Sequence, residues 1–132
     1  MAERSGKQVV RRFIEEVVNT GELDRLPGLV APALLEEMRA HIAGVRSTYP
    51  DLLVSVEEQI VEGELVVTRV VARGTHAGSF RGIAPTGRPV AVEGVNIDRV
   101  RDGLILEHRG VANTLQALMA VGAVVPAPGP AR

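Results

Sequence analysis

The chain has 132 residues, and its 15 basic and 16 acidic residues leave a formal net charge of -1 at neutral pH. This length fits one domain, and the balanced charge gives no field that would hold nucleic acid or an anionic membrane. The sequence has no cysteine and only three Phe or Tyr side chains, at Phe13, Tyr49 and Phe80, which excludes disulfides and leaves few rings on which bases could stack.

The first 50 residues have a helical pattern. Ser5 and Gln8 have the spacing of a capping box, and the apolar side of the helix that follows consists of Val9, Val10, Phe13, Ile14, Val17 and Val18. A short second helical turn is expected over 23–30. A third helix is expected from about 33 to 47, with His41 at the edge of its apolar stripe.

After Pro50 the pattern becomes that of strands, rich in valine and separated by glycine turns. We expect strands at about 53–61, 65–74, 89–100 and 104–112, a long connection over 75–88 and a final helical turn over 115–121. Helices followed by strands predict an α+β fold with helices lying across a curved antiparallel sheet. The expected domain covers 1–122, and the proline-rich tail 123–132 is expected to be disordered.

The hairpin around Asp102-Gly103 determines which side chains meet. A three-residue loop 101–103 would pair Asp98 with Leu106, Asn96 with His108 and Gly94 with Gly110, all on one apolar concave face. A two-residue turn would instead pair Asn96 with Arg109 and separate this cluster.

The opposite face of the last two strands mixes apolar and charged side chains. The apolar set is Val95, Ile97, Ile105 and Val111, and the charged set is Glu93, Arg99, Glu107 and Arg109. Such a mixture is typical of interfaces, so we expect a homodimer through this face.

The polar start 1–8 lacks the apolar core of a secretory signal, and no apolar run is long enough to span a membrane, so we expect a cytoplasmic protein.

Four short motifs occur in order along the second half of the chain: GTHAG at 74–78, PTGR at 85–88, RVRDG at 99–103 and EH at 107–108. With the leucine-rich turn before Gly122, they make the sequence from about 9 to 122 similar to the SnoaL-like polyketide cyclase family. The resemblance implies the cone-shaped fold of nuclear transport factor 2, with helices packed on a curved antiparallel sheet of four to six strands. It also implies a pocket between sheet and helices and catalysis by side chains alone.

The resemblance also implies where the catalytic groups should be. In the founding cyclases an aspartate near the end of the last strand is the acid/base, assisted by a histidine on the preceding strand, and here those positions are Gly110 and Asn96. A glycine cannot take a proton from carbon, so the founding mechanism does not transfer. The connection at 30–32 is shorter than in relatives, so the pocket is expected to be open, shallow or completed by a second subunit.

The candidate site residues therefore come from the remaining polar groups of the concave face. His108 could be an acid/base or a structural histidine, and Asp98 could orient it, act as the acid/base or lie solvated near the hairpin end. Asn96 could donate to a substrate carbonyl or satisfy a neighbour, and His41 could reach the pocket roof. Gly110 would form part of the substrate site. The three histidines lack metal-ligand spacing, so we expect no metal and no cofactor.

Three functions fit these residues. The leading one is a cofactor-independent cyclase or isomerase, such as an ester cyclase, of secondary polyketide-type metabolism acting on an apolar small molecule. The alternative is a non-catalytic subunit of the same fold that binds an apolar ligand. The third, an epoxide hydrolase, requires carboxylates near the pocket.

Overall fold

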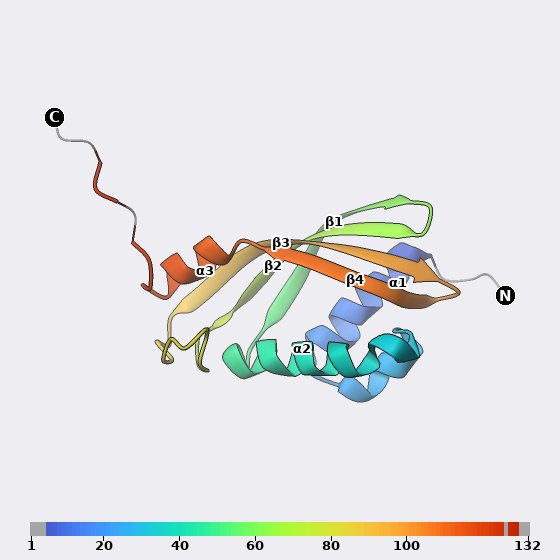
Figure 1. The fold of residues 1–132 in the computed structure, drawn as a ribbon, viewed down its shortest axis with the longest axis horizontal. Helices are drawn as coiled ribbons and strands as arrows, with labels where there is room; N and C mark the ends of the chain where they lie inside the picture. Colours follow the sequence, from blue (N-terminus) through green and yellow to red (C-terminus); the bar gives the residue numbers. More distant parts are fainter. Residues whose placement is uncertain (1–4, 126, 130–132) are drawn as a thin grey trace.

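The computed structural model describes residues 5–125 and 127–129. The strands β1 (Leu53–Glu62), β2 (Leu65–Thr75), β3 (Pro89–Arg101) and β4 (Leu104–Ala112) form one antiparallel sheet in that order. The helical segments are α1 (Gly6–Phe13), a π-helical turn (Ile14–Val18), 3-10 turns (Leu23–Gly28 and Pro32–Leu34), α2 (Leu35–Thr48) and α3 (Thr114–Ala120). Figure 1 shows α1 and α2 on one side of the curved sheet. The predicted α+β fold is confirmed.

Helix α1 begins as its sequence predicts. The Ser5 hydroxyl accepts a hydrogen bond from the Gln8 backbone N–H, and the Gln8 side chain accepts one from the Ser5 N–H, which completes the capping box. After Phe13 the helix widens into a π-helical turn that the apolar pattern does not indicate. Such turns often occur at functional sites, and this one begins beside the groove described below.

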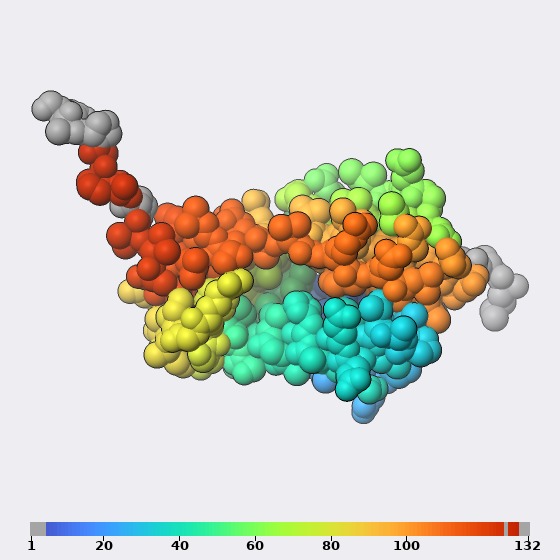
Figure 2. Space-filling model, viewed as in Figure 1, coloured from blue at the N-terminus to red at the C-terminus, as the bar shows by residue number. Residues whose placement is uncertain are grey.

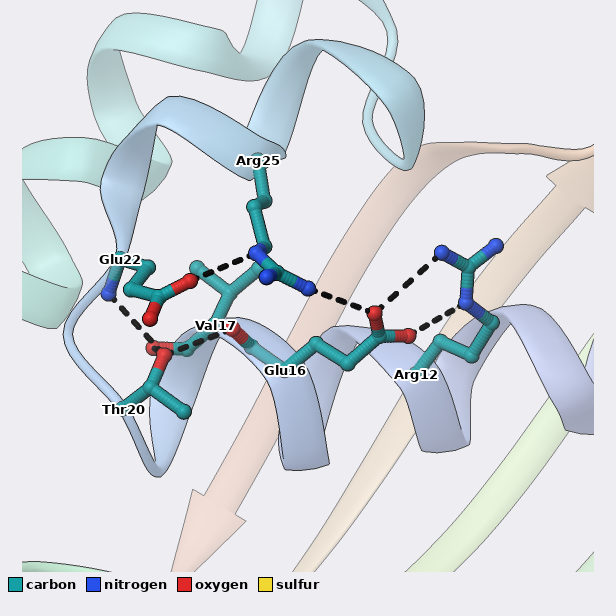
Figure 3. A network of polar contacts seen from close by, with 6 residues as sticks. All are labelled: Arg12, Glu16, Val17, Thr20, Glu22 and Arg25. Atoms are coloured by element: carbon teal, nitrogen blue, oxygen red, sulfur yellow. Dashed lines mark hydrogen bonds and ion pairs between the residues drawn. The ribbon is translucent and has the colours of Figure 1, made fainter.

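A polar network joins the end of this first helix to the 3-10 turn that follows (Figure 3). Glu16 pairs with Arg12 and, at 2.9 Å, with Arg25, which also pairs with Glu22 at 2.6 Å. The Thr20 hydroxyl donates to the Glu16 backbone carbonyl. Hydrogen bonding from Arg12 lowers the pKa of Glu16. The network holds the turn between the two helical segments, while its exposed pairs add little stability singly.

The observed strands agree with the predicted ones to within one residue, but the predicted register of the last hairpin is wrong. The turn has two residues, Asp102 and Gly103, both with positive φ (52° and 77°), so Arg101 pairs with Leu104. A bulge between Arg99 and Val100 then shifts the pairing by one further residue. Because the two shifts add, the four residues Asn96, Asp98, His108 and Gly110 still share the face toward the helices, although each lies opposite a residue two positions from its expected partner.

The bulge also overturns one assignment for the outer face. Ile105, expected there with Val95 and Val111, is fully buried because the bulge turns it toward the helices. It accepts a backbone hydrogen bond from Ala31 and donates one to Leu29, which fixes the short connection between the second and third helical segments.

Two apolar cores leave a groove between them. The larger joins α1, the turns after it and α2 to the sheet, with Val9, Phe13, Leu26, Ile42, Val66 and Ile105 among its buried members. The smaller contains Val90, Ala117 and Val121 and lies against Tyr49, Phe80 and Ile83.

Within the described residues, no helix is both long and apolar enough to cross a membrane. Of the expected tail, 126 and 130–132 lie outside the described residues, and 123–125 and 127–129 form neither helix nor strand.

Candidate functional site

The groove lies between α2 and the concave face of the sheet. Two adjoining cavities of about 360 and 170 Å³ share His41, Asn96 and His108 in their walls. A third, of about 250 Å³, shares Ala72, Val92 and Ala112 with the larger of these. Figure 2 shows the surface hollowed between α2 and the strands above it. The cavities therefore form sectors of one groove.

Asp98 and His108 are the polar pair of this groove. They lie directly opposite each other on β3 and β4, and Asp98 Oδ1 is 2.6 Å from His108 Nδ1. The Asp98 side chain is 1% exposed, so it is not the solvated aspartate that a position near a strand end suggests. Its second oxygen, Oδ2, is buried without a hydrogen-bond partner among the described residues. The carboxylate accepts the Nδ1 hydrogen, which leaves the lone pair of neutral His108 on Nε2.

The free nitrogen of His108 faces the groove. A Cβ atom added to Gly110 would lie 3.9 Å from His108 Nε2 and 2.7 Å from Asn96 Oδ1. Position 110 therefore faces the same space as His108 and Asn96, as predicted. Gly110 leaves room for the Asn96 amide, and a side chain there would have to displace it.

Asn96 lies opposite Gly110 on β3 and lines both cavities. No hydrogen bond within the described chain engages its amide, whereas neighbouring Asp98 is bonded to His108. An amide in this state can donate to, or accept from, a molecule in the groove. The expected pairing of Asn96 with His108 is wrong: Asn96 lies opposite Gly110, which is two residues from His108 along β4.

His41 reaches the groove from α2. Its ring centroid is 6.4 Å from that of His108, and it lines both cavities. Burial lowers the pKa of His41, as does the nearby His108, while Glu37 acts in the opposite direction. The net shift favours the neutral ring, which can present an N–H donor. The sequence places His41 at the edge of the apolar stripe of its helix, and this edge faces the groove in the structure.

Phe13 also shapes the site. The centroid of the Phe13 ring lies 6.0 Å from that of the His108 ring. The sequence marks Phe13 only as a core residue of its helix, and the structure shows that the helix widens at the next residue.

His76 is fully buried away from Asp98 and His108, and its Nδ1 accepts a hydrogen bond from the Thr86 N–H at 3.2 Å. This contact holds the loop 76–88.

The arrangement places a histidine, held by a buried carboxylate, beside an amide and a second histidine. It can accept a proton through His108 Nε2 and offer hydrogen bonds to a nearby oxygen. Among the described residues, no three His, Asp or Glu side chains cluster closely enough to hold a metal ion.

Comparison with known proteins gives concordant matches. A family model described as SnoaL-like polyketide cyclase matches residues 8–121. Aklanonic acid methyl ester cyclase AcmA from Streptomyces galilaeus is 29% identical over 117 residues, covering 76% of this chain and 78% of that protein. The crystal structure of IdmH from Streptomyces antibioticus is 29% identical with a TM-score of 0.80, covering 90% of this chain and 99% of that one. TsrD from Streptomyces laurentii is 27% identical with a TM-score of 0.81, covering 94% and 100%.

Proposed function

Since the chain belongs to the SnoaL-like polyketide cyclase family, we propose that it cyclises or isomerises a polyketide-type carbonyl compound in the groove, without a cofactor. The contact between Asp98 and His108, with Nε2 facing the groove, carries this proposal. The family's acid/base carboxylate has no counterpart at Gly110, and in this proposal His108 takes over its role. The name of AcmA, a methyl ester cyclase, supports the reaction class.

The proposed chemistry begins with removal of a proton from the carbon next to a substrate carbonyl. His108 Nε2 takes the proton, and the charge that develops on the carbonyl oxygen is stabilised by the Asn96 amide and the neutral N–H of His41. In a cyclisation the enolate carbon attacks a second carbonyl, forming a carbon–carbon bond, and the His108 proton passes to the new alkoxide. In an isomerisation the proton returns to another carbon. Asp98 stabilises the imidazolium formed in between.

Exchange of substrate hydrogen for solvent deuterium tests the proton-abstraction step. Aromatic β-keto esters in D₂O would be followed by NMR with the wild type, with His108→Gln and with Glu107→Gln. Glu107 is the neighbour of His108 on β4 but is exposed and paired with Arg99 at 3.1 Å. The proposal expects the wild type and Glu107→Gln to exchange the hydrogen faster than the substrate does alone, and His108→Gln to leave exchange at the spontaneous rate. Equal exchange by all three would remove His108 as the base.

The second candidate is a non-catalytic subunit that binds an apolar ligand. It is favoured by Gly110, which offers no carboxylate, and by the connection at Val30, Ala31 and Pro32, which is shorter than the resemblance to the family implies. A ligand that co-purifies and remains unchanged on incubation would support it. Epoxide opening has no specific support: Asp98 is buried against His108, and although Glu37 lines the same cavity, no hydrogen bond within the described chain links it to His108.

We also propose that the protein is a cytoplasmic homodimer formed through the outer face of the sheet. On this face Leu53, Ile60 and Val111 are exposed by 58, 63 and 75%, and they lie among ion pairs such as Arg69–Glu58. Although Ile105 is not on this face, the exposed apolar side chains that remain there are enough to favour a partner. Light scattering at micromolar concentration should give twice the mass of the chain, and a monomer would contradict the proposal.

A further inference from the structure

The groove continues from His108 into the cavity of about 250 Å³, which lies beside α3 and the loop 76–88. Its walls are almost entirely apolar and include Val45, Tyr49, Leu52, Phe80, Val90, Val92 and Ala117. This end of the groove has no part in the proton transfer proposed above. The side chains that line this end therefore indicate which group the substrate carries besides its reacting carbonyl.

Two arginines and no acidic residue line this cavity. Arg73 pairs with Leu53 and Ala91 in the outward-facing set of the sheet, and its guanidinium donates to the Ser55 hydroxyl at 3.3 Å. Its charge is thus directed to the outer face. Arg81 is the charged side chain left at the cavity.

Arg81 is held there by its backbone. It has a φ of 48° in a tight turn between Phe80 and Ile83, whose backbones exchange two hydrogen bonds of 3.0 and 2.7 Å. A positive φ is costly for a residue other than glycine, and such strain often occurs at ligand sites. The guanidinium carbon lies 5.7 Å from the centre of the Phe80 ring, and Phe80 itself lines the cavity. Within the described chain, Arg81 enters no ion pair, and the segment 76–88 contains no Asp or Glu.

The opposite sector of the groove has the reverse charge. Glu37 lines the cavity that contains His108, and the Asp98 carboxylate lies against His108, so an anionic group is disfavoured there and favoured near Arg81. The two ends are far apart, since the six steps along the strand from Val90 to Asn96 span roughly 20 Å at about 3.3 Å per residue. One molecule that reaches both ends must be elongated.

We propose that the groove takes an elongated, apolar carboxylic acid whose carboxylate binds Arg81 while its reacting carbonyl lies at His108. This rests on the proposed function, because it names the substrate class of the same groove. The carboxylate and guanidinium would form a charge-assisted pair, and the rings or chain of the substrate would fill the apolar wall between them.

A matched pair of ligands tests the inference without turnover. Anthraquinone-2-carboxylate and its methyl ester, titrated calorimetrically into the protein, should differ about five-fold in dissociation constant in favour of the acid. Arg81→Asn should bind both equally, because asparagine accepts a positive φ but lacks the charge. Arg81→Lys should retain part of the preference. Arg88→Asn is the control, since Arg88 is on the same loop but lines no part of this cavity.

The outcomes separate this inference from the proposed reaction. A preference for the acid that disappears in Arg81→Asn and persists in His108→Gln supports the Arg81 site, whether or not the protein turns a substrate over. Equal binding of acid and ester by the wild type, binding of neither, or an unchanged preference in Arg81→Asn would overturn it.

Discussion

Asp98 and His108 face each other directly across β3 and β4, with 2.6 Å between Asp98 Oδ1 and His108 Nδ1. The pair combines a carboxylate withdrawn from solvent with a ring whose other nitrogen faces the groove.

Replacing Asp98 with asparagine should reduce turnover about 10²- to 10⁴-fold while leaving the fold intact, because the imidazolium formed during proton transfer loses its carboxylate partner. The pH dependence of kcat should change as well. The measurement is kcat against pH for the wild type and Asp98→Asn, with circular dichroism as the control for folding. An unchanged kcat and profile would reduce Asp98 to a structural residue.

Replacing His108 with alanine should lower the free energy of unfolding by about 1–3 kcal/mol, because it leaves the buried Asp98 carboxylate without its donor. The double variant Asp98→Ala/His108→Ala should be less destabilised than the sum of the two single variants. Urea unfolding of all four proteins measures this coupling. Strict additivity would mean that the two side chains do not stabilise each other.

Replacing Gly110 with aspartate should put a carboxylate into the groove beside His108. Because a Cβ there approaches Asn96 Oδ1 to 2.7 Å, the Asn96 amide must move, and we expect a cost of about 1–2 kcal/mol in stability. Gly110→Asp/Asn96→Ser should recover part of it. Chemical denaturation gives the stability, and NMR titration gives the pKa of the new carboxyl, which burial should raise above its usual value near 3.9. A carboxyl with an unshifted pKa would indicate that position 110 is solvated.

His41 should titrate below the ordinary histidine value, because burial and His108 both lower its pKa. In His108→Gln the second of these causes is removed, so the pKa of His41 should rise toward 6.5 without reaching it. Two-dimensional NMR of the imidazole resonances follows both proteins across pH 4–9. If the pKa of His41 is the same in both, the two rings do not influence each other electrostatically.

Glu64 should make stability fall in acid. Hydrogen bonding from Arg101, and then from Arg99, lowers its pKa from 4.5 to about 2. A depressed pKa in the folded state stabilises the protein above pH 4.5, and this contribution is lost as pH falls toward 2. The wild type should therefore melt above Glu64→Gln at pH 7 and at a similar temperature at pH 2, with a smaller gap in high salt. Glu62→Gln, two residues away at the end of β1, serves as the control.

The sequence by itself determined the elements and the faces they present. The capping box at Ser5, the apolar stripes of the helices and the alternation of the strands are local patterns with periods of 3.6 and 2, so they need no knowledge of distant contacts. For the same reason the concave face could be predicted to carry Asn96, Asp98, His108 and Gly110 together. The resemblance to the family rests on short motifs that lie within these elements.

Only the tertiary structure decided which of these side chains touch. The pairing of Asp98 with His108 depends on a two-residue turn and a bulge, and a bulge forms where packing buries Ile105 rather than where local propensity demands it. The approach of His41 and Phe13 to His108, and of Arg81 to the far cavity, likewise joins elements distant in sequence. Periodicity assigns a residue to a face, but contact across a groove is determined by how the helices pack on the sheet.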